Sequence, residues 1–200
     1  MDSKRWSILY RGPLSSCNYG CTYCPFAKTR NTRAELRDDA EKLARFSTWV
    51  SAQTDRSIGI LFTPWGEALI RKHYQRAMID LSRMPHVERV AAQTNLSCKL
   101  DWIAECDLDT VAFWTTFHPT QTSMDDFLAR CDTLDKIGAR YSVGVVGFKE
   151  AYDEILELRE RLSPSTYLWI NAYKREPDYY TEEDVRRFEA IDPLFRYNTR

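Results

Sequence analysis

Short runs of apolar, β-branched and aromatic residues alternate along the chain with longer charged stretches. The runs are nearly continuous, as in residues 58–62, which is typical of parallel strands covered on both faces. The charged stretches carry apolar residues at helical spacing. We therefore expect strands at residues 6–10, 58–62, 87–92, 110–115, 141–146 and 167–172, and helices at residues 33–53, 70–84, 124–137, 152–162 and 181–191, with a shorter helix at 100–106.

The spacing of these elements predicts the fold class. Most successive strands begin about 30 residues apart, which is the size of one strand–helix unit. Six such units need about 180 residues, whereas a complete eight-unit barrel takes about 250. The 200 residues therefore predict one α/β domain, residues 1–200, folded as a partial (β/α)6 TIM-like barrel with parallel strands inside and helices outside.

Capping residues support the helix boundaries. Ser123 precedes an acidic first turn, and Gly138 follows the last turn of the same helix. Thr181 precedes three carboxylates, which are favourable at the positive end of a helix dipole.

Composition and charge narrow the class of protein. With 44% hydrophobic and 28% charged residues, the chain is typical of a soluble globular protein. A formal net charge of -1 favours neither nucleic acid nor an anionic membrane as the main partner. No apolar stretch approaches the ~20 residues of a membrane span, and no signal-peptide core follows Met1. Six cysteines without a disulfide-rich context predict a reducing, cytoplasmic location.

Three cysteines, Cys17, Cys21 and Cys24, stand within eight residues directly after the first predicted strand. Thiolates are preferred ligands of soft metals and iron–sulfur clusters, and close spacing gathers three of them at small entropic cost. A [4Fe-4S] cluster has four irons, so three cysteines leave one iron open, as in catalytic metal sites. We expect Gly20 to adopt a positive φ beside the cluster, and Pro25 to stiffen the end of the loop.

The CxxxCxxC spacing, with the aromatic Tyr23 before the last cysteine, resembles the signature of the radical S-adenosylmethionine (SAM) superfamily. The resemblance implies that the three thiolates hold a [4Fe-4S] cluster and that SAM chelates the fourth iron. It implies that reduction cleaves SAM to methionine and a 5′-deoxyadenosyl radical, which abstracts hydrogen from a small molecule or a peptide. A reducing electron donor such as flavodoxin or ferredoxin is implied as well. Residues 9–26 also resemble an uncharacterised bacterial group from small biosynthetic gene cassettes.

Other interpretations of the cysteines stay open. Zinc sites usually pair one CxxC with a second CxxC or with histidines, and electron-transfer clusters usually have a fourth thiolate. Neither partner follows nearby, which counts against a non-catalytic iron–sulfur or zinc module without excluding it. The chain stops at Arg200 without a cap or a polar tail. It is either a fragment or a core domain that lacks the family's C-terminal extension.

In a parallel barrel, the loops after the strands meet at one face and carry the chemistry. Gly66 and Glu67 follow the second strand and resemble the family's Gly-Gly-Glu-Pro motif, which binds the SAM amino group. Trp65 replaces the first glycine of that motif and Ala68 replaces the proline. The resemblance implies that Glu67 lies near the amino group, where a carboxylate suits an ammonium donor.

Further SAM contacts are implied at the neighbouring loops. Asn95 follows the third strand and is a candidate for the ribose or the substrate, although asparagine is also common in turns. Thr116 and His118 follow the fourth strand and are candidates for the ribose or the methionine carboxylate. Tyr23 either flanks adenine or shields the cluster from solvent.

Several residues are less specific candidates. They are Lys28, Arg30 and Arg33 as an anion site, the fifth-strand glycines Gly144 and Gly147 as a surface for adenine, Asn171 and Lys174 as substrate contacts, Tyr179 and Tyr180 as a pocket wall or edge cover, and Cys98, Cys106 and Cys131 as small buried residues.

Overall fold

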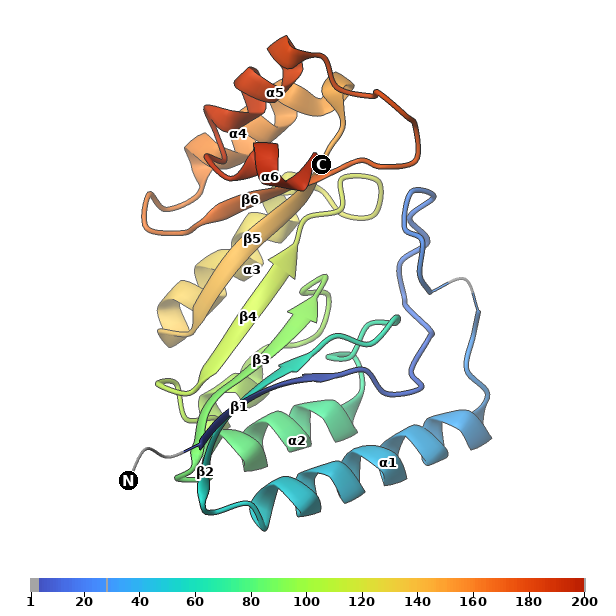
Figure 1. Ribbon diagram of the computed structural model, residues 1–200, viewed down its shortest axis with the longest axis vertical. Coiled ribbons are helices and arrows are strands. Elements are labelled where there is room, and N and C mark those ends of the chain that lie inside the picture. The colour runs from blue at the N-terminus through green and yellow to red at the C-terminus, as the bar shows by residue number, and fades with distance from the viewer. Residues whose placement is uncertain (1–3, 28, 200) are drawn as a thin grey trace.

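The computed structural model of the protein describes residues 4–27 and 29–199. At its centre, six parallel strands form one sheet and lie side by side in chain order (Figure 1). This order arises because each helical crossover returns the chain beside the strand just completed. The strands are β1 (Lys4–Tyr10), β2 (Arg56–Phe62), β3 (Val87–Thr94), β4 (Val111–Thr116), β5 (Arg140–Gly147) and β6 (Leu168–Ala172).

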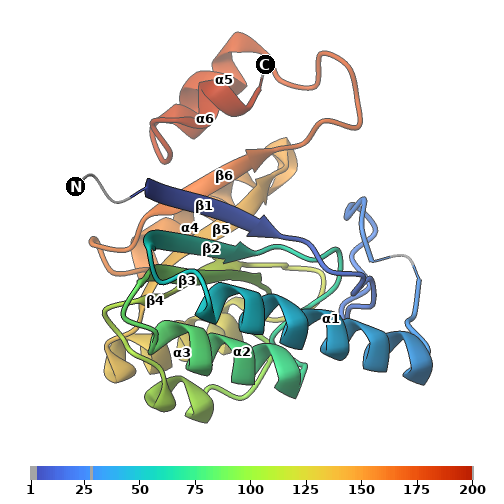
Figure 2. The ribbon, with the colours of Figure 1, turned by 60° about the horizontal axis from the view of Figure 1, so that its bottom comes forward.

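The sheet curls into a half-barrel, which confirms the predicted partial (β/α)6 architecture. Figure 2 shows α1, α2 and α3 along one face of the sheet. No described helix is long and apolar enough to cross a membrane. The helices are α1 (Arg33–Ser51), α2 (Lys72–Ser82), α3 (Met124–Ile137), α4 (Tyr152–Arg161), α5 (Glu182–Glu189) and α6 (Phe195–Asn198), with 3₁₀ segments η1 (Asp101–Glu105) and η2 (Lys149–Ala151).

The observed elements match the predicted strands and the five long helices, with ends that differ by at most two residues. Residues 100–106 differ in type, because they contain the tighter 3₁₀ segment η1 instead of an α-helix. The two shortest elements, η2 and α6, were not predicted. They span three and four residues, too few for a helical periodicity to show in the sequence.

The predicted caps are confirmed. The Ser123 hydroxyl accepts a backbone hydrogen bond at the start of α3, and Gly138 ends that helix in the left-handed conformation, with φ at 81°. Thr181 caps α5. A further capping box, between Thr32 and Glu35, begins α1 immediately after the cysteine loop. It fixes the point at which that loop becomes helix.

The two faces of the sheet differ in burial. In β2, Ile58, Ile60 and Phe62 are buried, whereas Gly59 and Leu61 between them are only partly covered. Successive side chains of a strand point to opposite faces, so the buried set packs under the helices and the other set lies on the inner side of the half-barrel. We call this inner side the concave face.

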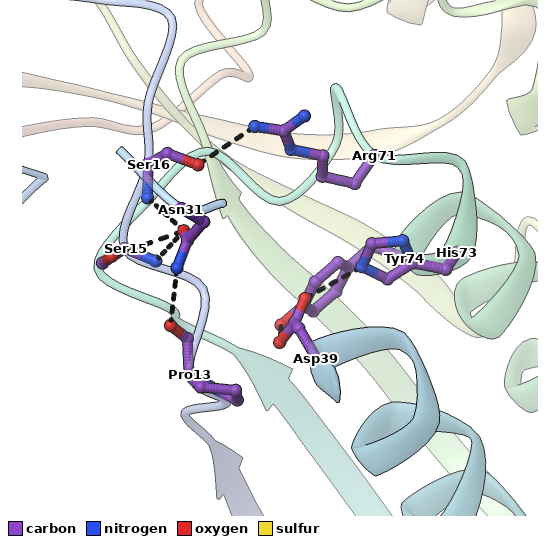
Figure 3. Close-up of polar contacts among 8 residues, drawn as sticks. All are labelled: Pro13, Ser15, Ser16, Asn31, Asp39, Arg71, His73 and Tyr74. Atoms are coloured by element: carbon purple, nitrogen blue, oxygen red, sulfur yellow. Dashed lines mark hydrogen bonds and ion pairs between the residues drawn. The ribbon is translucent and has the colours of Figure 1, made fainter. Parts of the chain in front are cut away.

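A buried carboxylate joins the first two helices. Asp39 of α1 is fully buried and accepts hydrogen bonds from His73 Nε2 at 2.9 Å and from the Tyr74 hydroxyl at 3.2 Å (Figure 3). His73 is therefore held against α1 by this contact. A Cβ atom at Gly12 would lie 2.9 Å from Asp39 Oδ1 and 3.0 Å from the Tyr74 hydroxyl. The chain that leaves β1 is therefore in close contact with Asp39 and Tyr74.

Candidate functional site

A cavity of about 800 Å³ lies where the strands end, at the face on which their following loops meet. Its volume is within the roughly 300–1,000 Å³ that is usual for small-molecule sites. The three candidate cluster cysteines and all the candidate SAM contacts contribute to its lining, as do Asn171 and Lys174. These cysteines and SAM contacts are Cys17, Cys21, Tyr23, Cys24, Gly66, Glu67, Asn95, Thr116 and His118.

The start of the cysteine loop is held by two side chains, one from the end of the same loop and one from the segment before α2. Asn31 Oδ1 accepts hydrogen bonds from the backbone N–H groups of Ser15 and Ser16, both at 2.8 Å, and its Nδ2 donates to Pro13 O at 3.5 Å (Figure 3). Arg71, which precedes α2, donates from Nη2 to the Ser16 hydroxyl at 3.0 Å. The chain directly before the first cysteine is therefore fixed in place.

The loop after β2 packs directly on the cysteine loop. Gly66 N donates to Leu14 O, and Glu67 N donates to Ser16 O, both at 3.2 Å. A Cβ atom at Gly66 would lie 2.1 Å from Ser16 O, so only glycine permits this approach. The glycine of the predicted motif therefore allows the two loops to pack together, and Glu67 follows it directly against the residue that precedes Cys17.

The end of the cysteine loop is held from the opposite edge of the sheet. Arg175, three residues after β6, donates from Nη1 to Thr22 O and from Nη2 to Cys24 O, both at 3.1 Å. This side chain also lines the cavity. Sequence reasoning did not single out Arg175. Its only signal was its place in the loop after the last strand.

The cysteine sulfurs lie among hydrogen-bond donors as well as apolar groups. Tyr19 N donates to Cys17 Sγ at 3.3 Å, and Asn95 Nδ2 lies 3.7 Å from the same sulfur. Burial raises the pKa of the Cys17 thiol, and the Tyr19 N–H acts in the opposite sense. The Cys24 thiol donates to Phe26 O at 3.5 Å.

The donor set fits a three-cysteine iron–sulfur cluster. The lining holds Cys17, Cys21 and Cys24 and no fourth cysteine. Each thiolate of a [4Fe-4S] cluster binds a different iron, so the sulfurs need not converge on one point. Within the described ranges, no three His, Cys, Asp or Glu side chains converge as a single metal ion requires. Three thiols are one fewer than the four ligands of a structural zinc site.

Glu67 joins the second and third loops. Its side chain is buried, and its carboxylate accepts hydrogen bonds from Leu69 N at 2.9 Å, Thr94 Oγ1 at 2.8 Å and Asn95 N at 2.7 Å. Burial raises the pKa of Glu67, and these three donors act to lower it. A carboxylate offers about four acceptor positions, and these donors occupy three of them.

Tyr23 and His118 form one wall of the cavity. The Tyr23 hydroxyl lies 2.8 Å from His118 Nδ1, and the rings stack with centroids 5.9 Å apart. Burial lowers the pKa of His118 to about 4, so its imidazole is neutral near pH 7. The ring of Tyr23 also meets Phe148 edge-on at 5.2 Å.

Some of the less specific candidates lie elsewhere. The exposed side chains of Arg30 and Arg33 do not line the cavity, and Lys28 lies outside the described residues. Tyr179 and Tyr180 do not line the cavity, and their hydroxyls donate to Glu150 and to the backbone at the end of β5. Cys106 and Cys131 are buried as expected, and Cys98 is partly buried.

Two expectations for glycines are wrong. A Cβ atom at Gly144 would lie 2.2 Å from the indole of Trp169, so Trp169 occupies the close approach that was expected for adenine. At Gly147, the corresponding space is taken by Ile170. Gly20 does not have a positive φ, because Gly138 is the one glycine of the described residues in that conformation.

Comparison with known proteins shows the fold. No protein-family model and no curated protein matches the chain. The solved structure of anSMEcpe with bound AdoMet aligns with a TM-score of 0.69 and 15% identity, covering 96% of this chain and 60% of that one. Native anSMEcpe with AdoMet and the Cp18Cys peptide, or with the Kp18Cys peptide, aligns with a TM-score of 0.67 in each case, at 13% and 12% identity. These two alignments cover 97% of this chain and 62% of that one.

The chain thus spans about 60% of the length of anSMEcpe, a radical SAM enzyme. The match covers nearly all of the chain. By its architecture, this chain shares the fold of anSMEcpe.

Proposed function

We propose that the protein is a radical SAM enzyme in which Cys17, Cys21 and Cys24 hold a [4Fe-4S] cluster. The observation that carries this proposal is the three-cysteine lining of a cavity at the loop face of a radical SAM fold. A lining with three thiols leaves one iron open to an exchangeable ligand, which a closed four-thiolate site does not offer.

When bound, the cluster supplies the single electron that cleaves SAM to methionine and a 5′-deoxyadenosyl radical, which abstracts hydrogen from the substrate. The protein positions the reactants and excludes water around them. The buried Glu67 carboxylate retains an acceptor position for the SAM amino group. Tyr23 and His118 form the wall against which the nucleoside is held, with the Nε2–H of neutral His118 as a donor.

The substrate is proposed only by class, as a small molecule or a peptide. A peptide is supported by two of the solved neighbours, which hold peptides beside AdoMet. The required electron is proposed to come from flavodoxin or ferredoxin in a reducing cytoplasm. The resemblance of residues 9–26 to proteins of small biosynthetic gene cassettes stays a prediction.

The test is anaerobic reconstitution with iron and sulfide, followed by dithionite reduction with SAM and an assay for 5′-deoxyadenosine. We expect about four irons per chain, a cluster EPR signal that SAM perturbs, and release of 5′-deoxyadenosine. Cys21→Ala should abolish all three, whereas the matched Cys98→Ala should not, because Cys98 lies outside the lining.

Two results would contradict the proposal. A cluster that forms but neither binds nor cleaves SAM would favour an electron-transfer module. Bound zinc without uptake of iron would favour a structural zinc module.

A further inference from the structure

A second cavity, of about 510 Å³, lies on the concave face toward the amino-terminal ends of the strands. Its lining includes Arg5, Arg89 and Arg140, and no acidic residue is among the described residues that form it. The whole chain has a net charge of only -1, so this concentration of positive charge is local. We call it the arginine cavity.

Small side chains make room for this cavity. The concave positions beside the arginines carry a hydrogen, a methyl or a hydroxymethyl group, so the sheet itself fills little of the inner volume. These positions are Ser7, Gly59, Ala91, Ala112 and Ser142.

The strand register brings the arginines to neighbouring rows of the sheet. Gly59 pairs with Ser7 on one side and with Arg89 on the other, so these three residues form one row. Ala112 pairs with Arg140, in the next row along the strands. Adjacent strands are ~4.8 Å apart and residues rise ~3.3 Å along a strand, so Arg89 and Arg140, two strands and two residues apart, are separated by roughly 12 Å. Long arginine side chains on a concave surface can reach one ligand across that distance.

The charges are available to a ligand. Within the described part of the chain, Arg89 forms no ion pair or hydrogen bond. Arg5 pairs with Glu88 at 3.2 Å, but these side chains are 64% and 49% exposed, and such surface pairs contribute little stability. Arg140 donates to the Asp109 carbonyl from Nη2 alone, which leaves its other N–H groups for a ligand. Guanidinium groups bind carboxylate and phosphate through paired hydrogen bonds.

The concave face continues from the arginine cavity to the cysteines. We call the cavity of about 800 Å³ that the cysteines line the cysteine cavity. A third cavity, of about 400 Å³, shares Trp114 and Ser142 with the arginine cavity and shares Trp169 with the cysteine cavity. Thr116, in the cysteine cavity, lies four residues beyond Ala112 on β4, a distance of about 13 Å along the strand. A single elongated ligand can therefore contact both ends.

We propose that the arginine cavity is an oxyanion subsite for the substrate. The ligand class is an elongated molecule that ends in a carboxylate or a phosphate. Its oxyanion binds Arg89 and Arg140, its apolar body lies along Trp114 and Trp169, and its far end reaches the cysteine cavity. That this ligand is the substrate rests on the proposed function. The subsite itself rests on the arginine cavity and on its continuity with the cysteine cavity.

The test is calorimetric titration of the reconstituted full chain with decanoate, whose extended chain matches the span between the two cavities. Decyl phosphate is the second probe and distinguishes the two oxyanions, and neutral decanol is the uncharged control. We expect Arg89→Gln and Arg140→Gln each to weaken the binding of the preferred oxyanion about tenfold, or about 1.4 kcal/mol. Arg37→Gln, which removes an exposed charge from α1, should leave it unchanged.

Circular dichroism and thermal melting should show that all variants remain folded. Equal oxyanion affinity in Arg89→Gln, Arg140→Gln and the unsubstituted protein would overturn the subsite, even in a protein that cleaves SAM. An equally large loss in Arg37→Gln would overturn it too, because the effect would then be one of net charge. Arginine-dependent binding in a protein that never cleaves SAM would retain the subsite and overturn the proposed function.

Discussion

The Tyr23 hydroxyl lies 2.8 Å from His118 Nδ1, and this contact joins the cysteine loop to the loop after β4. Burial acts on both partners. It lowers the pKa of His118 to about 4 and raises the pKa of Tyr23 above its usual range. Near neutral pH both groups are therefore uncharged, and the tautomer of the imidazole sets which of them donates. This wall of the cavity depends on an uncharged histidine.

The pH dependence of stability should reveal that histidine. The folded-state pKa of about 4 lies below the usual 6.5, so the unfolded chain binds more protons between these values. The stability that neutral His118 contributes is complete above pH 6.5 and is lost as the pH falls toward 4. Between pH 7.5 and pH 5, the unsubstituted protein should lose about 2 kcal/mol more free energy of unfolding than His118→Gln. Urea unfolding at the two pH values measures the free energy of unfolding of each protein. Equal losses in the unsubstituted protein and in His118→Gln would contradict the prediction.

Arg175 should influence the cluster as well as the loop. Arg175→Gln removes a positive charge and a two-carbonyl clamp next to Cys24, so we expect lower iron retention. The reduction potential should fall on the order of 50 mV, nearly tenfold in the one-electron equilibrium. Arg175→Lys keeps the positive charge but cannot bind both carbonyls as the guanidinium does. It should restore most of the reduction potential but not the retention of iron. Redox titration followed by EPR measures this, and an unchanged potential in Arg175→Gln would rule out the electrostatic effect.

Asn31 should be required for a stable cysteine loop. Asn31→Ala leaves the N–H groups of Ser15 and Ser16 without their acceptor, at a cost of about 1–3 kcal/mol. For a chain of this length, Tm should fall by roughly 2–12 °C. Asn31→Asp is the matched control, because its carboxylate still accepts both hydrogen bonds. Differential scanning calorimetry compares the variants, and an equal fall in both would assign the effect to the lost amide nitrogen.

The contact between the first two loops predicts opposite results for two glycines of the site. Gly66→Ala places a Cβ atom 2.1 Å from Ser16 O, a backbone atom that cannot yield without moving the loop. We expect a loss of about 1–3 kcal/mol in the free energy of unfolding, together with lower iron uptake. Gly20→Ala should be tolerated, because the nearest atom outside its own neighbours, Gln121 Oε1, lies 3.9 Å from the new carbon. Similar iron content in the two variants would show that the loop contact does not shape the site.

The elements and the cysteine loop could be predicted because their signals are local. Near-continuous apolar runs mark β2 and β5, a glycine marks the end of α3, and the cysteines are separated by only a few residues. The inferences for the elements and for the cysteine loop each need a window shorter than one strand–helix unit. Strand order followed from the length of the whole chain and from the regular alternation of strands and helices.

The side chains that hold the site could not be predicted because their partners are distant in the chain. Arg175 contacts residues 151 and 153 positions away, and Trp169 lies over Gly144 on the neighbouring strand. Whether Arg175 or one of the basic residues Arg30 and Arg33 lies beside the cysteines depends on the curl of the sheet. No spacing in the sequence encodes that curl.

The clamp from Arg175 also bears on the order of events during protein synthesis. The cysteine loop is among the first segments to leave the ribosome, yet the side chain that completes it is made 151 residues after Cys24. At 5–20 residues per second, this interval is roughly 8–30 s. For that period the nascent chain carries three cysteines in a loop that lacks its final support, so cluster delivery belongs after the last strand has docked.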